Sequence, residues 1–262
     1  MSGIFCSLRQ LSVTYGRGKN AALDRVDLDI VAGERLAIIG ESGSGKSTLA
    51  RALAGLLPEG ATVGGEILWP ELGHPPSAGR DFGFVFQDPG SSLNPVLTIG
   101  EQIAEGARRH VGLSWKQAYA RAEELLGRVR IPQPDKAMRA FPHQLSGGQR
   151  QRVAIAAAIA ATPALLIADE ATSALDVVVQ AEIVRLLDGL VREDGMTLLF
   201  ITHDIALASG FVDRIAVFRN ARLVEAGPVR SVLSAPESDY TAALIASHRD
   251  LATPPLIAEV PS

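Results

Sequence analysis

The stretch GESGSGKST, from Gly40 to Thr48, constrains this chain more than any other part of the sequence. Gly40–Ser47 fits the pattern G-x-x-x-x-G-K-S/T in full. It follows the apolar run RLAIIG and leads into STLARALAGLL, which has helical periodicity. The backbone N–H groups of such a loop turn inward around phosphates where a strand passes into the first turn of a helix. The sequence therefore predicts a phosphate-binding loop in an α/β domain.

The residue types in this loop indicate a nucleoside triphosphate. Glycines let the backbone curve around phosphates, and Lys46 supplies a positive charge near the β- and γ-phosphates. The Ser47 hydroxyl is placed to coordinate Mg²⁺. The alternative, a flexible glycine loop with a chance lysine, is disfavoured by the complete motif in its strand–helix context. The residues predicted to bind the nucleotide here are Gly40, Glu41, Ser42, Gly43, Ser44, Gly45, Lys46, Ser47 and Thr48.

A second apolar run, ALLIAD, ends in two carboxylates, Asp169 and Glu170. We expect Asp169 to orient Mg²⁺ and Glu170 to polarise the attacking water, as phosphoryl transfer requires. Two adjacent carboxylates at a solvated strand end are the alternative, and the preceding phosphate loop argues against it.

The stretch QLSGGQRQR contains another turn suited to an anion. Ser146, Gly147 and Gly148 open a predicted helix whose N–H groups point outward with no Cβ to block them, and whose dipole favours negative charge. One chain thus has two helix starts suited to phosphate. The nearby pair Arg150 and Arg152 is interpreted as a solvated or salt-bridged helix face.

The remaining composition restricts the class of protein. A net charge of −4 gives no electrostatic case for a nucleic-acid partner. The single cysteine, Cys6, excludes an internal disulfide and makes a reduced, cytoplasmic setting the default. We expect no signal peptide. The longest uncharged stretch, 153–168, is shorter than the roughly 20 residues of a membrane span, so we expect a helix followed by a buried strand.

The chain is expected to form a single domain over residues 1–250. Strand signals dominate 1–87 and return in 153–231, which we interpret as the core. Residues 88–152 carry the amphipathic patterns IGEQIAEGARRH and SWKQAYARAEELLGRV and are interpreted as a helical insertion. No internal repeat is visible, and the tail 251–262 is expected to be loosely ordered.

Together these motifs resemble the ATP-binding cassette (ABC) proteins, the nucleotide-binding subunits of ABC transporters. Gly40–Ser47 matches Walker A, Leu145–Gln149 the signature motif and Leu165–Glu170 Walker B. The resemblance covers nearly the whole chain in the family's motif order. It implies a RecA-like P-loop NTPase core with an antiparallel β subdomain and an inserted helical subdomain.

The resemblance assigns further residues. Gln87 matches the Q-loop and would reach Mg²⁺, Ser173–Asp176 matches the D-loop, and His203 matches the switch histidine that senses the γ-phosphate. Tyr15 lies where the family stacks an aromatic ring on adenine. Without the family resemblance, Gln87 would be an ordinary surface amide, His203 a histidine at the end of a strand, and Tyr15 an aromatic residue of an edge strand.

The resemblance also implies partners. Two cassettes, identical or different, pair head to tail, so that Ser146, Gly147, Gly148 and Gln149 of one chain cap the ATP held by the other. ATP with Mg²⁺, two transmembrane permease subunits and a periplasmic or extracellular solute-binding protein complete such a system. The ATPase is then peripheral, at the cytoplasmic face of the inner membrane.

The stretches FQDPGSSLNP and APESDYTAALIAS resemble the dipeptide, oligopeptide and nickel importer ATPases. The short segment around GHPPSAGR and the lack of a cysteine cluster tilt the interpretation slightly toward nickel or metallophore subunits. Alternatives are the ATPase of an exporter, a non-transport ABC protein, or an inactive regulatory cassette. The presence of Glu170 and His203 argues against the last of these.

Overall fold

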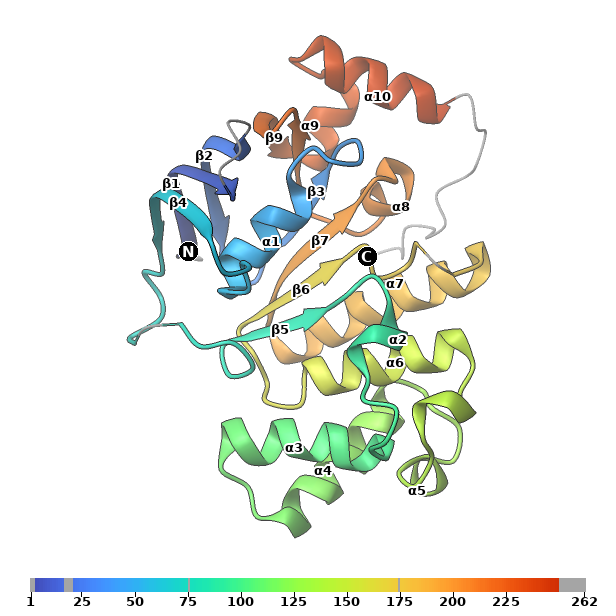
Figure 1. Ribbon diagram of the computed structural model, residues 1–262. Coiled ribbons are helices and arrows are strands. Elements are labelled where there is room, and N and C mark those ends of the chain that lie inside the picture. Colours follow the sequence, from blue (N-terminus) through green and yellow to red (C-terminus); the bar gives the residue numbers. More distant parts are fainter. Residues whose placement is uncertain (1–2, 17–20, 75, 174, 250–262) are drawn as a thin grey trace. The chain divides into compact units, whose positions relative to one another are not determined.

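The computed structural model describes residues 3–16, 21–74, 76–173 and 175–249, so the predicted tail lies outside the described residues, as does Ala174 of the predicted D-loop. The chain divides into two compact units (Figure 1). The first comprises Met1–Pro76 and Thr197–Ser262, and the second comprises Ser77–Met196.

The first unit contains an antiparallel sheet of three strands in the order β2-β1-β4. The strands are β1 (Ile4–Tyr15), β2 (Ala21–Val31) and β4 (Ala61–Leu68). From Val26 to Ile30, alternate residues of β2 are buried, because successive side chains of a strand point to opposite faces of the sheet. The predicted antiparallel β subdomain is therefore confirmed.

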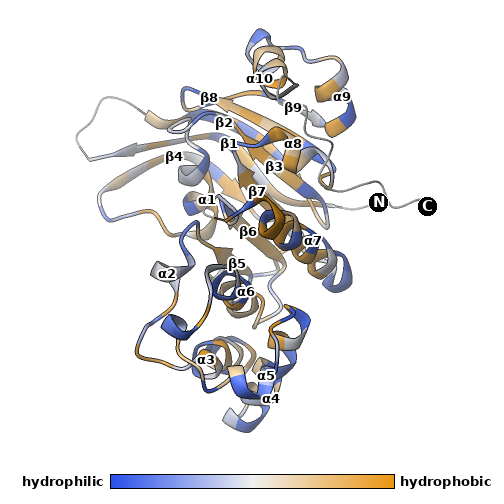
Figure 2. Cartoon of the chain, turned by 90° about the vertical axis from the view of Figure 1, so that its right-hand side faces the viewer, coloured by the Kyte–Doolittle hydropathy of each residue, from blue (hydrophilic) through white to orange (hydrophobic). Residues whose placement is uncertain are grey.

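The first unit also contains parallel strands that carry the phosphate loop. Strand β3 (Arg35–Ile39) lies between β7 (Thr197–Thr202) and β8 (Arg214–Arg219), parallel to both, and β9 (Arg222–Pro228) pairs antiparallel with β8. Strand β7 and nearly all of β3 are buried, because a strand covered on both faces needs a continuous apolar run (Figure 2).

The helices of the first unit are α1 (Lys46–Ala54), which begins directly after the loop, α8 (Ile205–Ser209), α9 (Val229–Ser234) and α10 (Asp239–Arg249). The sequence predicted α1 from its periodicity. It did not predict α8, α9, α10 or β9.

The second unit pairs two parallel strands, β5 (Phe82–Val85) and β6 (Leu165–Asp169), and is otherwise helical. Its helices are α2 (Pro89–Ser92), α3 (Ile99–Val111), α4 (Trp115–Arg128), α5 (Pro134–Ala137), the 3₁₀ helix η1 (Pro142–Gln144), α6 (Gly147–Ala158) and α7 (Val177–Asp194). The two predicted amphipathic helices are α3 and α4. The segment DPGSSLNP, which follows β5, contains the short helix α2, with Pro89 as its first residue.

Local sequence explains where these helices begin and end. Thr98 and Glu101 form a capping box at the start of α3, and Gly112 ends that helix in the left-handed conformation. Helix α7 buries an apolar face, visible in Figure 2 beside a hydrophilic one.

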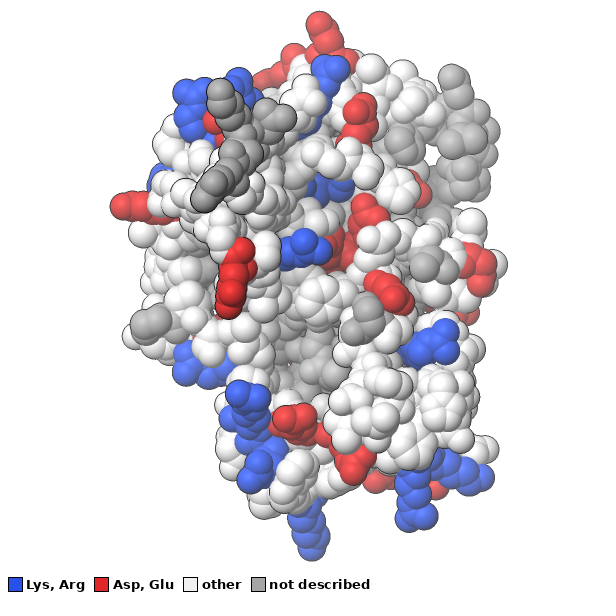
Figure 3. All heavy atoms as spheres, viewed as in Figure 1, with Lys and Arg blue, Asp and Glu red and all other residues white. Residues whose placement is uncertain are grey.

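Charged side chains of both signs are mixed over the face shown in Figure 3. On α6, Arg152 Nη2 lies 2.6 Å from Glu182 Oε2 of α7, so the predicted salt-bridged helix face is confirmed for this arginine.

Within the described ranges, no helix is both long enough and apolar enough to cross a membrane.

Candidate functional site

The loop between β3 and α1 is organised around Lys46. Its Nζ donates hydrogen bonds of 2.8 Å to the carbonyl oxygens of Gly40 and Glu41, and only 4% of the residue is exposed. The Ser44 hydroxyl is also buried, with no hydrogen-bond partner among the described residues. A buried ammonium and a buried, unpartnered hydroxyl in one loop fit a highly charged phosphate, which satisfies both.

Gly45 is required at the start of α1. Its φ of 105° lies in the region that favours glycine, and a Cβ there would come 2.5 Å from the carbonyl oxygen of Ala22. We expect Gly45→Ala to lower the free energy of unfolding by about 1–3 kcal/mol, measured by urea denaturation.

Gly43→Ala is the matched control for this prediction. Gly43 also has a positive φ, 78°, but a Cβ there would meet nothing within 4 Å. Gly43→Ala should therefore lower the free energy of unfolding by about 1 kcal/mol, from backbone strain alone. Equal losses for the two variants would show that the close approach to Ala22 carries no cost.

Two further predicted residues belong to the same unit as the loop. The Tyr15 hydroxyl donates a 3.1 Å hydrogen bond to Thr48 Oγ1 of α1, and 36% of the tyrosine is exposed. Ile39 pairs with Thr202 across the parallel strands β3 and β7. Gly40 and His203 therefore follow neighbouring strands at the same edge of the sheet, and the His203 side chain is exposed there.

Gln87 and Glu170 likewise follow neighbouring parallel strands, within the second unit. Val85 pairs with Ala168, so each side chain lies two residues beyond a paired position of β5 or β6. Gln87 Nε2 donates to Ser173 Oγ at 3.2 Å, and Ser173 Oγ donates to the Glu170 carbonyl oxygen at 3.1 Å.

The two carboxylates at the end of β6 differ in environment. Asp169 is 6% exposed, whereas Glu170 is half-buried and has a φ of 47°. The left-handed conformation costs a non-glycine residue about 1–2 kcal/mol. It turns the chain sharply immediately after the buried strand.

The Ser-Gly-Gly turn begins α6, as predicted. Ser146 Oγ accepts a hydrogen bond from the Gln149 N–H at 3.2 Å, and Gln149 Oε1 accepts one from the Ser146 N–H at 2.9 Å. This capping box fixes the first turn, and Ser146 is exposed. The turn is therefore accessible to an anion from outside the unit.

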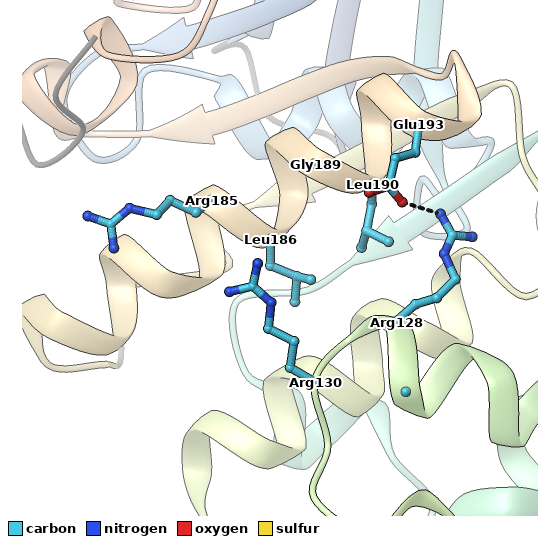
Figure 4. A pocket seen from close by; sticks show the side chains of 8 residues that line it. Arg128, Arg130, Arg185, Leu186, Gly189, Leu190 and Glu193 are labelled. Atoms are coloured by element: carbon cyan, nitrogen blue, oxygen red, sulfur yellow. Dashed lines mark hydrogen bonds and ion pairs between the residues drawn. The ribbon is translucent and has the colours of Figure 1, made fainter. Parts of the chain in front are cut away.

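A separate pocket of about 320 Å³ lies between α4 and α7 (Figure 4). Arg128 reaches across it to Glu193, at 3.1 Å, and also pairs with Asp194, at 2.9 Å; these acids raise the pKa of the guanidinium. None of the residues predicted to bind nucleotide lines this pocket. Its lining consists of Gly127, Arg128, Arg130, Arg185, Leu186, Gly189, Leu190 and Glu193.

The structure thus groups the predicted residues within each unit. Tyr15, the loop and His203 belong to the first unit, and Gln87, Ser146–Gln149 and the Asp169–Glu170 pair belong to the second. Sequence reasoning missed the contact of Tyr240 with the loop: the Tyr240 hydroxyl accepts a hydrogen bond from the Glu41 N–H at 3.3 Å.

A phosphate loop between a buried strand and a helix, in a mixed α/β chain with a second buried strand ending in Asp-Glu, defines the class of P-loop nucleotide-binding proteins. The profile of the family described as "ABC transporter" matches residues 23–173, more than half of the chain. The chain belongs to the ABC transporter ATP-binding family, whose cassettes bind ATP.

Curated relatives are 43–45% identical to the chain over the aligned residues. It is 44% identical to the peptidoglycan transport ATP-binding protein YejF of Agrobacterium fabrum, over 92% of this chain and 46% of that protein. Identity is 45% with the glutathione import ATP-binding protein GsiA of Salmonella typhimurium, over 86% and 39% of the two chains. It is 43% with the oligopeptide transport ATP-binding protein OppD of Bacillus subtilis, over 89% and 68%. The chain spans less than half the length of the first two.

Solved structures confirm the ABC ATPase fold predicted from the sequence. The cassette MJ0796, in a dimeric post-hydrolysis state bound to ADP and Pi, superposes with a TM-score of 0.75 at 33% identity, covering 86% of this chain and 99% of that one. CbiO1 from Clostridium perfringens gives a TM-score of 0.75 at 28% identity, covering 95% and 98%.

Proposed function

We propose that this chain binds and hydrolyses ATP as a subunit of an importer, and that its ATP site is one half of a shared site. The observation that carries the proposal is the presence of two distinct phosphate-suited helix starts in one chain. One contains the buried Lys46, and the other is the accessible turn at Ser146. The dimeric, ADP- and Pi-bound state of a cassette with this fold supports the pairing.

Each predicted residue has a role in this proposal. Lys46 turns from the loop carbonyls to the β- and γ-phosphates, and the loop N–H groups bind the remaining phosphate oxygens. Tyr15 stacks on adenine, held by its hydrogen bond to Thr48. His203 contacts the γ-phosphate at the edge of the sheet where the loop begins.

Glu170 acts on the attacking water. Its carboxylate accepts a proton from the water, the water oxygen bonds to the γ-phosphorus, and the bond from that phosphorus to the β–γ bridging oxygen breaks, giving ADP and phosphate. Gln87 is linked to the Glu170 backbone through Ser173 and thereby helps to orient the residues around Glu170.

Mg²⁺ fits the oxygen donors available here. The Ser47 hydroxyl, the Asp169 carboxylate and the Gln87 amide oxygen are the hard ligands that this ion prefers. When bound, the ion neutralises charge on the β- and γ-phosphates. We also propose that residues 1–250 form a single domain, with 88–152 as its helical insertion.

The partners follow from the family. We propose that a second cassette, of the same or a related chain, pairs with this one and that Ser146, Gly147, Gly148 and Gln149 cap its ATP. Two permeases and a solute-binding protein complete the importer, with this subunit at the cytoplasmic face of the membrane. Relatives named for oligopeptides, glutathione and peptidoglycan favour a peptide-class solute over nickel. The binding protein that copurifies with the permeases tests this choice.

Ser146→Arg tests the shared site. The bulky cation should block capping of the partner's phosphate while leaving this chain's own loop intact. We expect at least a tenfold lower ATPase rate with an ATP Kd within twofold of wild type, measured by steady-state turnover and by fluorescent ATP binding.

Ser114→Arg is the matched control. Ser114 caps α4 with the same kind of capping box, in the same unit. This variant should suffer the same loss of a cap without loss of turnover. Equal turnover in the two variants would contradict the shared site.

A further inference from the structure

A tyrosine distant in sequence contacts the phosphate loop. Tyr240 lies at the start of α10 and is 9% exposed. Its hydroxyl accepts the Glu41 N–H at 3.3 Å, and the Arg219 guanidinium lies 4.5 Å from its ring centroid. The ring is thus fixed by burial and by a cation–π contact, with its hydroxyl directed at the first residue after Gly40.

Glu41 is held through more than one group. Its carbonyl oxygen accepts from Lys46 Nζ at 2.8 Å, while its N–H donates to Tyr240. Burial raises the pKa of the Tyr240 phenol. The Glu41 N–H lowers that pKa, and the nearby Glu41 carboxylate raises it, because a negative charge opposes loss of the phenolic proton. Lys46 and Tyr240 therefore hold the same residue from two different elements.

The two contacts respond differently to ATP. If Lys46 turns to the phosphates, as the proposed function requires, the carbonyl oxygens of Gly40 and Glu41 lose its ammonium, although the Glu41 oxygen still accepts the Ser44 N–H at 3.2 Å. The hydrogen bond from Glu41 to Tyr240 does not involve Lys46 and persists. Together with the bond from the Ser44 N–H to the Glu41 carbonyl oxygen, it helps to keep the beginning of the loop in its binding shape, so that less conformational entropy is lost when ATP binds.

We propose that Tyr240 is a positioning residue for the phosphate loop, through which α10 sets the affinity of the chain for ATP. The proposal rests on ATP binding at Gly40–Thr48. The alternative is that Tyr240 only packs in the core, as the fully buried Thr241 beside it does.

Tyr240→Phe separates these roles, because phenylalanine keeps the ring and its contact with Arg219 and removes only the hydroxyl. We expect the ATP Kd to rise about 3- to 10-fold, as for the loss of one buried hydrogen bond. The kcat at saturating ATP should stay within twofold. In the ATP-free protein, the Glu41 amide should exchange its hydrogen faster, measured by NMR.

Tyr119→Phe is the control, since Tyr119 lies on α4 in the other unit. This variant should change neither the ATP Kd nor the exchange rate of the Glu41 amide. An unchanged Kd with an unchanged Glu41 exchange rate would overturn the proposal, as would a lower melting temperature with Kd unaltered. Failure of the proposed function itself would look different: ATP binding would then survive loss of Lys46.

Discussion

Lys46→Ala is expected to reduce ATP hydrolysis by on the order of 10²–10³-fold and to weaken ATP binding severely. The ammonium is buried and already bound to the carbonyl oxygens of Gly40 and Glu41. It is therefore positioned to meet developing negative charge where few water molecules screen it, which is where such a contact contributes most to the rate. Steady-state ATPase assays and isothermal titration with ATP measure the two effects.

Lys116→Ala is the control for this experiment, because Lys116 is an exposed lysine on α4 in the other unit. It should leave turnover and ATP binding unchanged. Full ATPase activity in Lys46→Ala would remove Gly40–Ser47 from the ATP site. Circular dichroism should show both variants folded.

Glu170→Gln is expected to leave ATP binding intact and to slow hydrolysis by about 10²–10⁴-fold. Glutamine has the same shape and suits the same turn after β6, but its amide cannot accept the proton of the attacking water. Single-turnover hydrolysis of radiolabelled ATP, at enzyme concentrations above Kd, isolates the chemical step from binding.

Glu123→Gln supplies the control, since Glu123 is an exposed glutamate on α4. Its single-turnover rate should equal that of wild type. If Glu170→Gln hydrolysed ATP equally fast, another group would have to be the base, and Glu170 would be left as a solvated strand end.

Sequence alone predicted the parts of the fold whose signals are local. Patterns a few residues long were enough to predict the buried strand before Gly40 and the helix after it. They were also enough to predict the buried strand that ends in the two carboxylates. The start of α6 at the Ser-Gly-Gly turn was equally predictable, because its signal lies within a few residues.

What the sequence did not reveal depends on distant partners or unusual backbone. Strand β9 follows a tight turn at Asn220 and Ala221, both with positive φ, and alanine gives no signal of such a turn. The sequence likewise gives no signal for the left-handed conformation of Glu170. The contact of Tyr240 with Glu41 joins residues 199 positions apart, and no local pattern encodes it.

The central claim is that ATP is enclosed between two chains, and the mass of the Glu170→Gln protein in saturating ATP tests it most directly. Light scattering should show ATP converting single chains into pairs, of two copies or of one copy with its companion cassette. Adding Ser146→Arg should weaken this pairing without changing the ATP Kd of the single chain. Pairs that form equally well with arginine at position 146 would contradict the claim.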